Sequence, residues 1–283
     1  GILEIVGALT GTAVALTIGK GLVNTSLISP LTVPAAVMGS MAWSLITYYY
    51  GIPVSETHGL IGGIIGSALA TAGFGSIKWM SINKVLIAII VSPLLGFFAG
   101  MFLMIVIYGL FHSYRARKVS AVFKSLQRFS AAFMAFSHGR NDAQKPMGII
   151  ILALAAYSGT QYAGSSVPLW IILTVGLVAG IGVAYGGWRI IKTLGMKIAD
   201  IGPVEGFAAE TSAAGVLQIA SFFGIPVSTT HTITSSIVGV GSALRFSNVR
   251  WQIAIDIAIS WILTLPVTIF FGFAFYWLMN LVF

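Results

Sequence analysis

The sequence is poor in charged residues and contains no cysteine. Only 8% of its 283 residues are Asp, Glu, Lys or Arg, whereas 57% are hydrophobic. Soluble domains carry about 25% charged residues, so this composition excludes an ordinary soluble globular protein. Without cysteine there is no disulfide pattern to interpret and no indication of the redox compartment.

The hydrophobic residues are gathered into long runs without any charge, at residues 85–111, 146–188 and 211–244. A run of about 18 apolar residues is already long enough to span a membrane as a helix. Buried core helices of a soluble protein would not explain several such runs together. Backbone polar groups in lipid must be satisfied within the segment, which favours helices. We therefore predict an all-α, multi-pass integral membrane protein of the cell membrane.

The formal net charge of +8 indicates a membrane orientation and not a nucleic-acid partner. The basic residues lie mostly between apolar segments, and the densest group contains no acidic residue: Arg115, Arg117, Lys118, Lys124 and Arg128. The positive-inside rule places this stretch, residues 113–128, in a cytoplasmic loop. Contact with anionic lipid fits these residues better than nucleic acid, which would require a soluble basic surface.

One octapeptide occurs twice, as GIPVSETH at residues 51–58 and as GIPVSTTH at residues 224–231. The same offset of 173 residues also aligns Gly7 with Gly180, Pro30 with Pro203 and Gly66 with Gly239. Such duplication is typical of transporters built from internal repeats. We predict two homologous halves, residues 1–112 and 129–283, joined by the basic loop 113–128. Sequence identity alone leaves open whether the repeats are inverted.

Each octapeptide is predicted to be a helix break followed by a new helix start near Pro53 or Pro226, because proline suits a first helical turn. A helix N-terminus presents free N–H groups and a partial positive charge, which suit an anion such as phosphate or sulfate. The first turns add polar side chains, namely Ser55, Thr57 and His58 in one copy and Ser228, Thr229, Thr230 and His231 in the other. Ordinary N-capping by serine is the simpler interpretation of one copy, but two matching copies favour an anion site. The histidines could orient the serines without touching the ligand.

A third polar cluster is SHGRNDAQKPMG, residues 137–148, directly before a charge-free run. Gly139 and Pro146 indicate a broken helix. Asn141 and Asp142 supply hard oxygen ligands of the kind that bind sodium at unwound segments of transporters, and Gln144 and Lys145 are predicted supporting residues. The alternative is a helix cap beside the basic loop.

Acidic residues within apolar segments are energetically costly and usually functional. Glu210, among small residues, is a candidate cation ligand. Glu56 stands where the second octapeptide has Thr229, and it could bind a cation, carry a proton or point away. Glu4 and Asp256 could equally lie near an interface.

The octapeptides together with HGRNDAQKPMG and GFAAETSAAG, residues 206–215, resemble the Pit-type inorganic phosphate transporter family over essentially the whole chain. The resemblance implies inverted repeats, re-entrant helical hairpins and a homodimer. It further implies phosphate binding by Ser55, Thr57, Asn141, Ser228, Thr229 and Thr230, and Na⁺ binding by Asn141 and Asp142, with Glu210 at a functional acidic position. Glu56, where the family more often has Ser or Thr, is kept as a further candidate Na⁺ ligand. The family carries a second Asn-Asp signature, which at the offset of 173 residues would precede Gly1, so we expect a further transmembrane segment upstream.

We therefore predict a symporter that moves phosphate with Na⁺ by alternating access, with no other cofactor. Proton coupling, metal-phosphate or sulfate transport would use the same fold, and Glu56, Glu210 and His58 leave proton coupling open. An anion channel is a further alternative, but it would not need buried carboxylates. An intramembrane enzyme is disfavoured because no nucleophile–base set is evident, and a purely structural subunit would not explain the buried charge.

Overall fold

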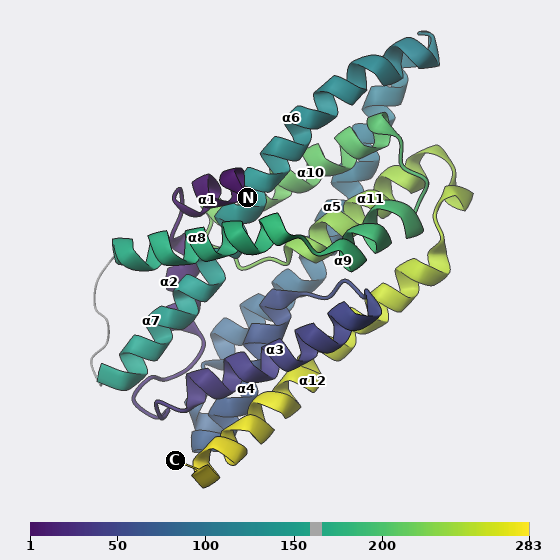
Figure 1. The fold of residues 1–283 in the computed structure, drawn as a ribbon. Helices are drawn as coiled ribbons and strands as arrows, with labels where there is room; N and C mark the ends of the chain where they lie inside the picture. Colours follow the sequence, from purple (N-terminus) through teal and green to yellow (C-terminus); the bar gives the residue numbers. More distant parts are fainter. Residues whose placement is uncertain (159–165, 283) are drawn as a thin grey trace.

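A computed structural model describes residues 1–158 and 166–282, and helices supply its regular secondary structure (Figure 1). The helices are α1 Ile2–Ala8, α2 Ala13–Gly21, α3 Thr32–Tyr50, α4 Glu56–Ala72, α5 Trp79–Phe111, α6 Ala116–Asp142, α7 Gln144–Ser158, α8 Leu169–Tyr185, α9 Trp188–Lys192, α10 Pro203–Phe222, α11 Thr229–Leu244 and α12 Trp251–Val282. One-turn helices at Gly73–Ser76 and Phe246–Asn248 follow α4 and α11. The prediction of an all-α fold is confirmed.

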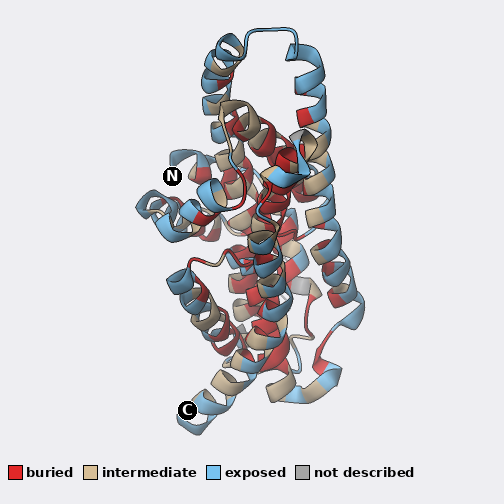
Figure 2. Ribbon diagram, turned by 90° about the vertical axis from the view of Figure 1, so that its right-hand side faces the viewer, coloured by how far each residue is buried: buried red, intermediate tan, exposed pale blue. Residues whose placement is uncertain are grey.

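Three helical stretches in the described part of the chain are long and apolar enough to cross a membrane: Glu56–Ser76, α5 and α12. Two bent pairs pass the same test together, α1 with α2 at 67° and α8 with the helical residues Trp188–Lys197 at 59°. The outer faces of α5 and α12 are apolar as well as exposed, with Phe102 and Ile262 as examples. Figure 2 shows buried residues gathered inside and exposed residues on the outer helix faces. This distribution suits a multi-pass membrane protein surrounded by lipid.

The two halves contain the same series of elements. α3, α4, a 3₁₀ turn and α5 follow one another in the first half, and α10, α11, a 3₁₀ turn and α12 follow in the second. The break between the first two helices falls on Gly51 (φ 68°) and on its counterpart Gly224 (φ 66°). Only glycine adopts this left-handed backbone conformation at little cost. The repeated sequence therefore folds into a repeated structure.

The halves are interlocked, because α4 and α11, which follow the two octapeptides, each pack against the long helix of the other half. α4 packs against α12 as well as α3, and α11 packs against α5 as well as α10. A Cβ added to Gly66 of α4 would lie 1.9 Å from the carbonyl oxygen of Ile269 in α12. A Cβ on Gly239 of α11 would lie 2.0 Å from that of Phe97 in α5. Glycine at both positions therefore permits direct backbone contact between the halves.

Three local predictions need correction. Residues 116–128, expected within a basic loop, form the first turns of α6, so only a short turn connects α5 to α6. α4 and α11 begin at Glu56 and Thr229, three residues beyond the prolines, because Ser55 and Ser228 take the capping positions. The break predicted between Gly139 and Pro146 is confined to Ala143, which separates α6 from α7.

Candidate functional site

Both octapeptides build a capped helix start. The Ser55 hydroxyl accepts a hydrogen bond from the backbone N–H of His58 at 3.2 Å. The Ser228 hydroxyl does the same for His231, also at 3.2 Å. The N-capping role weighed for these serines is therefore present in both copies. The N–H groups of the two residues before each histidine have no acceptor within the helix, and they remain available to an anion.

The two helix starts lie against each other. The Thr57 hydroxyl donates to the backbone carbonyl of Val227, which directly precedes Ser228, at 3.3 Å. The rings of His58 and His231 meet edge to face with their centroids 4.5 Å apart. Residues 170 positions apart in sequence thus form one continuous centre, and each half contributes one helix N-terminus to it.

Trp261 of α12 connects both starts. Its indole N–H donates to the carbonyl of Pro53 at 3.0 Å, and its ring stacks on His231 with a centroid distance of 3.8 Å. A single side chain therefore touches the first octapeptide by a hydrogen bond and the second by an aromatic face.

Trp261→Phe is expected to lower the free energy of unfolding by about 1 kcal/mol, because it removes the hydrogen bond to Pro53 but keeps a ring against His231. Trp261→Ala should cost about 3–5 kcal/mol, because the ring is lost as well. Thermal unfolding of the purified protein in detergent measures both. Equal stability of Trp261→Phe and the unaltered protein would contradict a role for the hydrogen bond.

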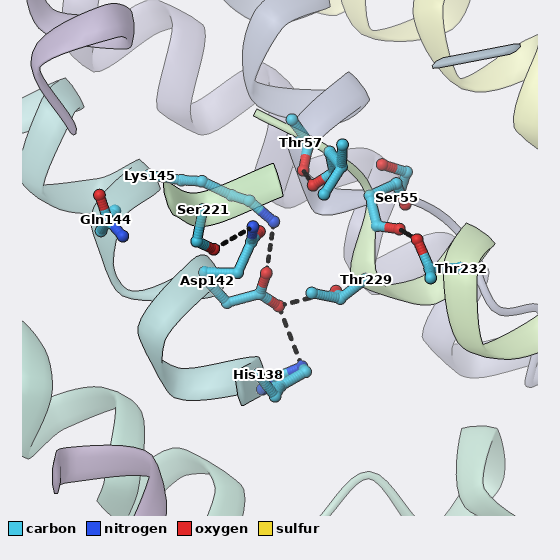
Figure 3. A network of polar contacts seen from close by, with 12 residues as sticks. Ser55, Thr57, His138, Asp142, Gln144, Lys145, Ser221, Thr229 and Thr232 are labelled. Atoms are coloured by element: carbon cyan, nitrogen blue, oxygen red, sulfur yellow. Dashed lines mark hydrogen bonds and ion pairs between the residues drawn. The ribbon is translucent and has the colours of Figure 1, made fainter. Parts of the chain in front are cut away.

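Asp142, at the end of α6, is the centre of a polar network (Figure 3). One carboxylate oxygen forms an ion pair with Lys145, whose side chain is 2% exposed. The other oxygen lies 3.0 Å from His138 Nε2 and accepts a hydrogen bond of 3.0 Å from the Thr229 hydroxyl at the start of α11. The network therefore joins the Asn-Asp motif directly to the second octapeptide.

The network continues to Glu4 of α1, which is 2% exposed. Its carboxylate lies 2.8 Å from the other ring nitrogen of His138, so His138 bridges two carboxylates. His138 is not among the residues predicted for the site. Its position one helical turn before Asp142 was the available signal, because residues four apart share a helix face. Glu4 has no such signal, since it is 134 positions from His138.

Asn141 is fully buried and only partly hydrogen-bonded. Its side-chain N–H donates to Ser221 of α10 at 3.0 Å. Its amide oxygen is buried and has no hydrogen-bond partner in the described part of the chain. An unpartnered carbonyl-type oxygen, one residue before a carboxylate in sequence, suits a hard cation such as Na⁺. Gln144 has a different role, because its side-chain oxygen accepts from the N–H of Val14 at 2.7 Å and so caps α2.

Of the two other predicted cation ligands, Glu56 is near enough to interact electrostatically with Asp142 and Lys145, whereas Glu210 lies apart from them. Glu56 is exposed and accepts a hydrogen bond from Ser44 at 2.9 Å. Glu210 accepts one from Ser130 at 2.5 Å. Glu210 and Ser221 are both in α10, and their separation in sequence puts them about 16 Å apart along the helix axis. Glu210 therefore does not share one ion with Asn141 and Asp142. Thr230 lies half-buried in the first turn of α11.

Ser228→Ala is expected to cost about 1 kcal/mol of stability, because the N–H of His231 loses its capping acceptor. Ser55→Ala should cost a similar amount for the same reason. Ser247→Ala, at an exposed position, is the matched control and should change little. Thermal unfolding compares the three, and an unchanged midpoint for both octapeptide variants would exclude the capping role.

Known proteins are similar to this chain along most or all of its length. The pattern of the phosphate transporter family fits residues 1–117 and 111–272. A probable low-affinity inorganic phosphate transporter of Rhizobium meliloti is 42% identical over 258 residues, covering 90% of this chain and 76% of that protein. A protein of the same description from Bacillus subtilis is 38% identical, covering 100% and 85%. A solved structure titled the sodium-dependent phosphate transporter superposes with a TM-score of 0.85 at 25% identity, covering 100% of this chain and 88% of that one. The chain therefore belongs to the phosphate transporter family.

Proposed function

We propose that this protein moves inorganic phosphate across the cell membrane by cation-coupled symport, with Na⁺ as the coupling ion. The observation that carries the proposal is the meeting of two helix N-termini beside the ion pair of Asp142 with the buried Lys145. The relatives named as phosphate transporters support the substrate, and the structural neighbour named as sodium-dependent supports the ion.

The phosphate site that we propose lies between the starts of α4 and α11. Free N–H groups and the positive ends of two helix dipoles converge there. Hydroxyl groups of Thr57 and Thr229 line the two starts, and Ser55, Ser228 and Thr230 belong to the same turns. The buried ammonium group of Lys145 adds a full positive charge beside them. Such a centre offers hydrogen-bond donors and positive charge, which a phosphate oxyanion requires.

The cation would bind at Asn141 and Asp142. The free amide oxygen of Asn141 and the Asp142 carboxylate are adjacent in sequence and point to hard-ion chemistry. Because Thr229 contacts the same carboxylate, a cation there would lie next to the anion, and each would lower the electrostatic cost of the other. In the proposed alternating-access cycle one set of helices moves against the other. The homodimer remains a prediction from the family resemblance.

A second candidate, proton-coupled phosphate transport, is favoured by the ion pair at Asp142. Lys145 already supplies a cation to this carboxylate, and His138 and Thr229 contact its other oxygen. A carboxylate with these partners has little free negative charge to offer Na⁺. Under this candidate Lys145 takes the place of the metal ion, and coupling is provided by protons.

Uptake of phosphate by the full-length protein in liposomes separates the two candidates. With Na⁺ coupling, replacement of Na⁺ by choline at constant pH should abolish concentrative uptake, because the driving ion is absent. With proton coupling, uptake should persist in choline and collapse when a protonophore is added. Concentrative uptake that resists both treatments would contradict cation coupling altogether. An anion channel would be indicated instead if phosphate only flowed down its gradient and if phosphate inside the liposomes did not stimulate uptake by exchange.

A further inference from the structure

A groove between α5 and α10 lies outside the polar centre. It has a volume of about 490 Å³ and is lined almost entirely by apolar atoms. The wall from α5 runs from Lys84 through Val91 to Leu95, and the facing wall includes Ile219 and Ala220. Ser92, also in the lining, is fully buried, and its hydroxyl has no hydrogen-bond partner in the described residues.

The length and depth of the groove match one leaflet of a bilayer. From Lys84 to Leu95 the helix rises about 16 Å, and half of a hydrocarbon core measures about 15 Å. α5 has 33 residues, so it is about 50 Å long and exceeds a hydrocarbon core of about 30 Å. Lys84 is five residues from the beginning of the helix, and the charge-free run 85–111 starts directly after it, so we place it at the level of the lipid headgroups. The groove therefore runs from the headgroups towards the middle of the membrane.

The charge at the outer end of the groove is positive and lies on the lipid-facing side. Lys84 is exposed, and a lysine at this depth extends its ammonium group towards the headgroups while its methylene chain lies along apolar surface. At the level of the headgroups, an anionic lipid brings a phosphate to this ammonium group.

We propose that this groove is a binding site for one anionic phospholipid of the leaflet opposite the basic end of α5. One acyl chain lies between α5 and α10, and the headgroup phosphate contacts Lys84. Val227 also lines the groove, and its carbonyl accepts the hydrogen bond from Thr57. The lipid chain therefore contacts the second octapeptide, so its presence supports the backbone that positions the start of α11.

Capture of a photoactivatable lipid tests the site. The full-length protein is reconstituted with phosphatidylglycerol that carries a diazirine on one acyl chain, and labelled peptides of α5 and α10 are quantified by mass spectrometry. Lys84→Gln should reduce labelling about fivefold, the effect of one lysine at an anionic surface, and Lys84→Arg should retain it. Val91→Trp should fill the groove and abolish labelling. Val106→Trp is the matched control, because Val106 is 37% exposed on the same helix and Val91 is 39% exposed, and it should leave labelling unchanged.

Three results would overturn the proposal. The first is labelling of Val91→Trp at the level of the unaltered protein. The second is equal labelling by phosphatidylcholine and phosphatidylglycerol probes. The third is loss of self-association in Val91→Trp with unchanged lipid labelling, because a second copy would then be the occupant. If Val91→Trp does not fold, Ile219→Trp fills the groove from the opposite wall. The readout is lipid capture, so the outcome does not depend on phosphate transport.

Discussion

Asp142→Asn is expected to reduce concentrative phosphate uptake by at least about a hundredfold, because it removes the negative charge that a coupling cation would need, and loss of one partner of a buried charge pair costs about 2–5 kcal/mol of binding. The substitution also leaves the buried ammonium group of Lys145 without its partner, which lowers the stability of the protein. Uptake of labelled phosphate into liposomes that contain equal amounts of folded protein measures the effect.

Two further variants separate function from folding at this position. Asp142→Asn combined with Lys145→Gln removes both charges of the pair and should regain stability, yet it should remain inactive because the site has lost its ion-binding groups. Asp256→Asn is the matched control, because Asp256 is exposed and its side chain contacts only Gln252 among the described interactions. It should transport at nearly the unaltered rate. Normal uptake by Asp142→Asn would remove Asp142 from the proposed site.

Gly66→Ala is expected to destabilise the direct contact between the two halves. The added Cβ would lie 1.9 Å from the carbonyl oxygen of Ile269, so α4 and α12 must separate. Overpacking of this kind costs about 1–3 kcal/mol or more. Gly239→Ala should behave alike, because its Cβ would lie 2.0 Å from the carbonyl oxygen of Phe97. The midpoint of thermal unfolding should fall for both variants.

Gly109→Ala is the control for this prediction. Gly109 also lies within a helix, α5, but a Cβ there meets no atom within 4 Å. Alanine should therefore stabilise this helix by about 0.5–1 kcal/mol. If Gly66→Ala and Gly109→Ala shift the unfolding midpoint in the same direction, glycine at residue 66 is not needed for close contact between the halves, and the prediction is wrong.

Much of the fold was predictable because its signals are local. Long apolar runs identified the membrane class, and the glycine and serine of each octapeptide identified a helix end and a helix start. The positions of these starts were wrong by three residues, because a capping serine and not the proline defines where the helix begins. The prediction of a loop at the basic stretch 116–128 was wrong, because these residues begin α6. Charged residues indicate contact with water, but they do not prevent helix formation.

The candidate site was predictable only in part. Asn141, Asp142 and the octapeptides could be chosen because polar groups in apolar segments are costly. Glu56 and Glu210 were chosen for the same reason. The cost of placing a polar group in an apolar segment does not reveal which other polar group it contacts. Glu210 bonds to Ser130 instead, and this pairing depends on how α6 packs against α10.

The sequence by itself determined that this is a multi-pass helical membrane protein, duplicated, with one polar helix start in each half. These properties depend on composition and on residues within a few positions of one another. Only the tertiary structure decided that Thr229 and His138 share the Asp142 carboxylate, that Glu4 extends the network, and that Asn141 meets Ser221. Apart from the contact of His138 with Asp142, which lies within one turn of α6, these contacts join residues 80 to 134 positions apart. Such contacts arise from the packing of whole helices, and no local pattern in the chain encodes them.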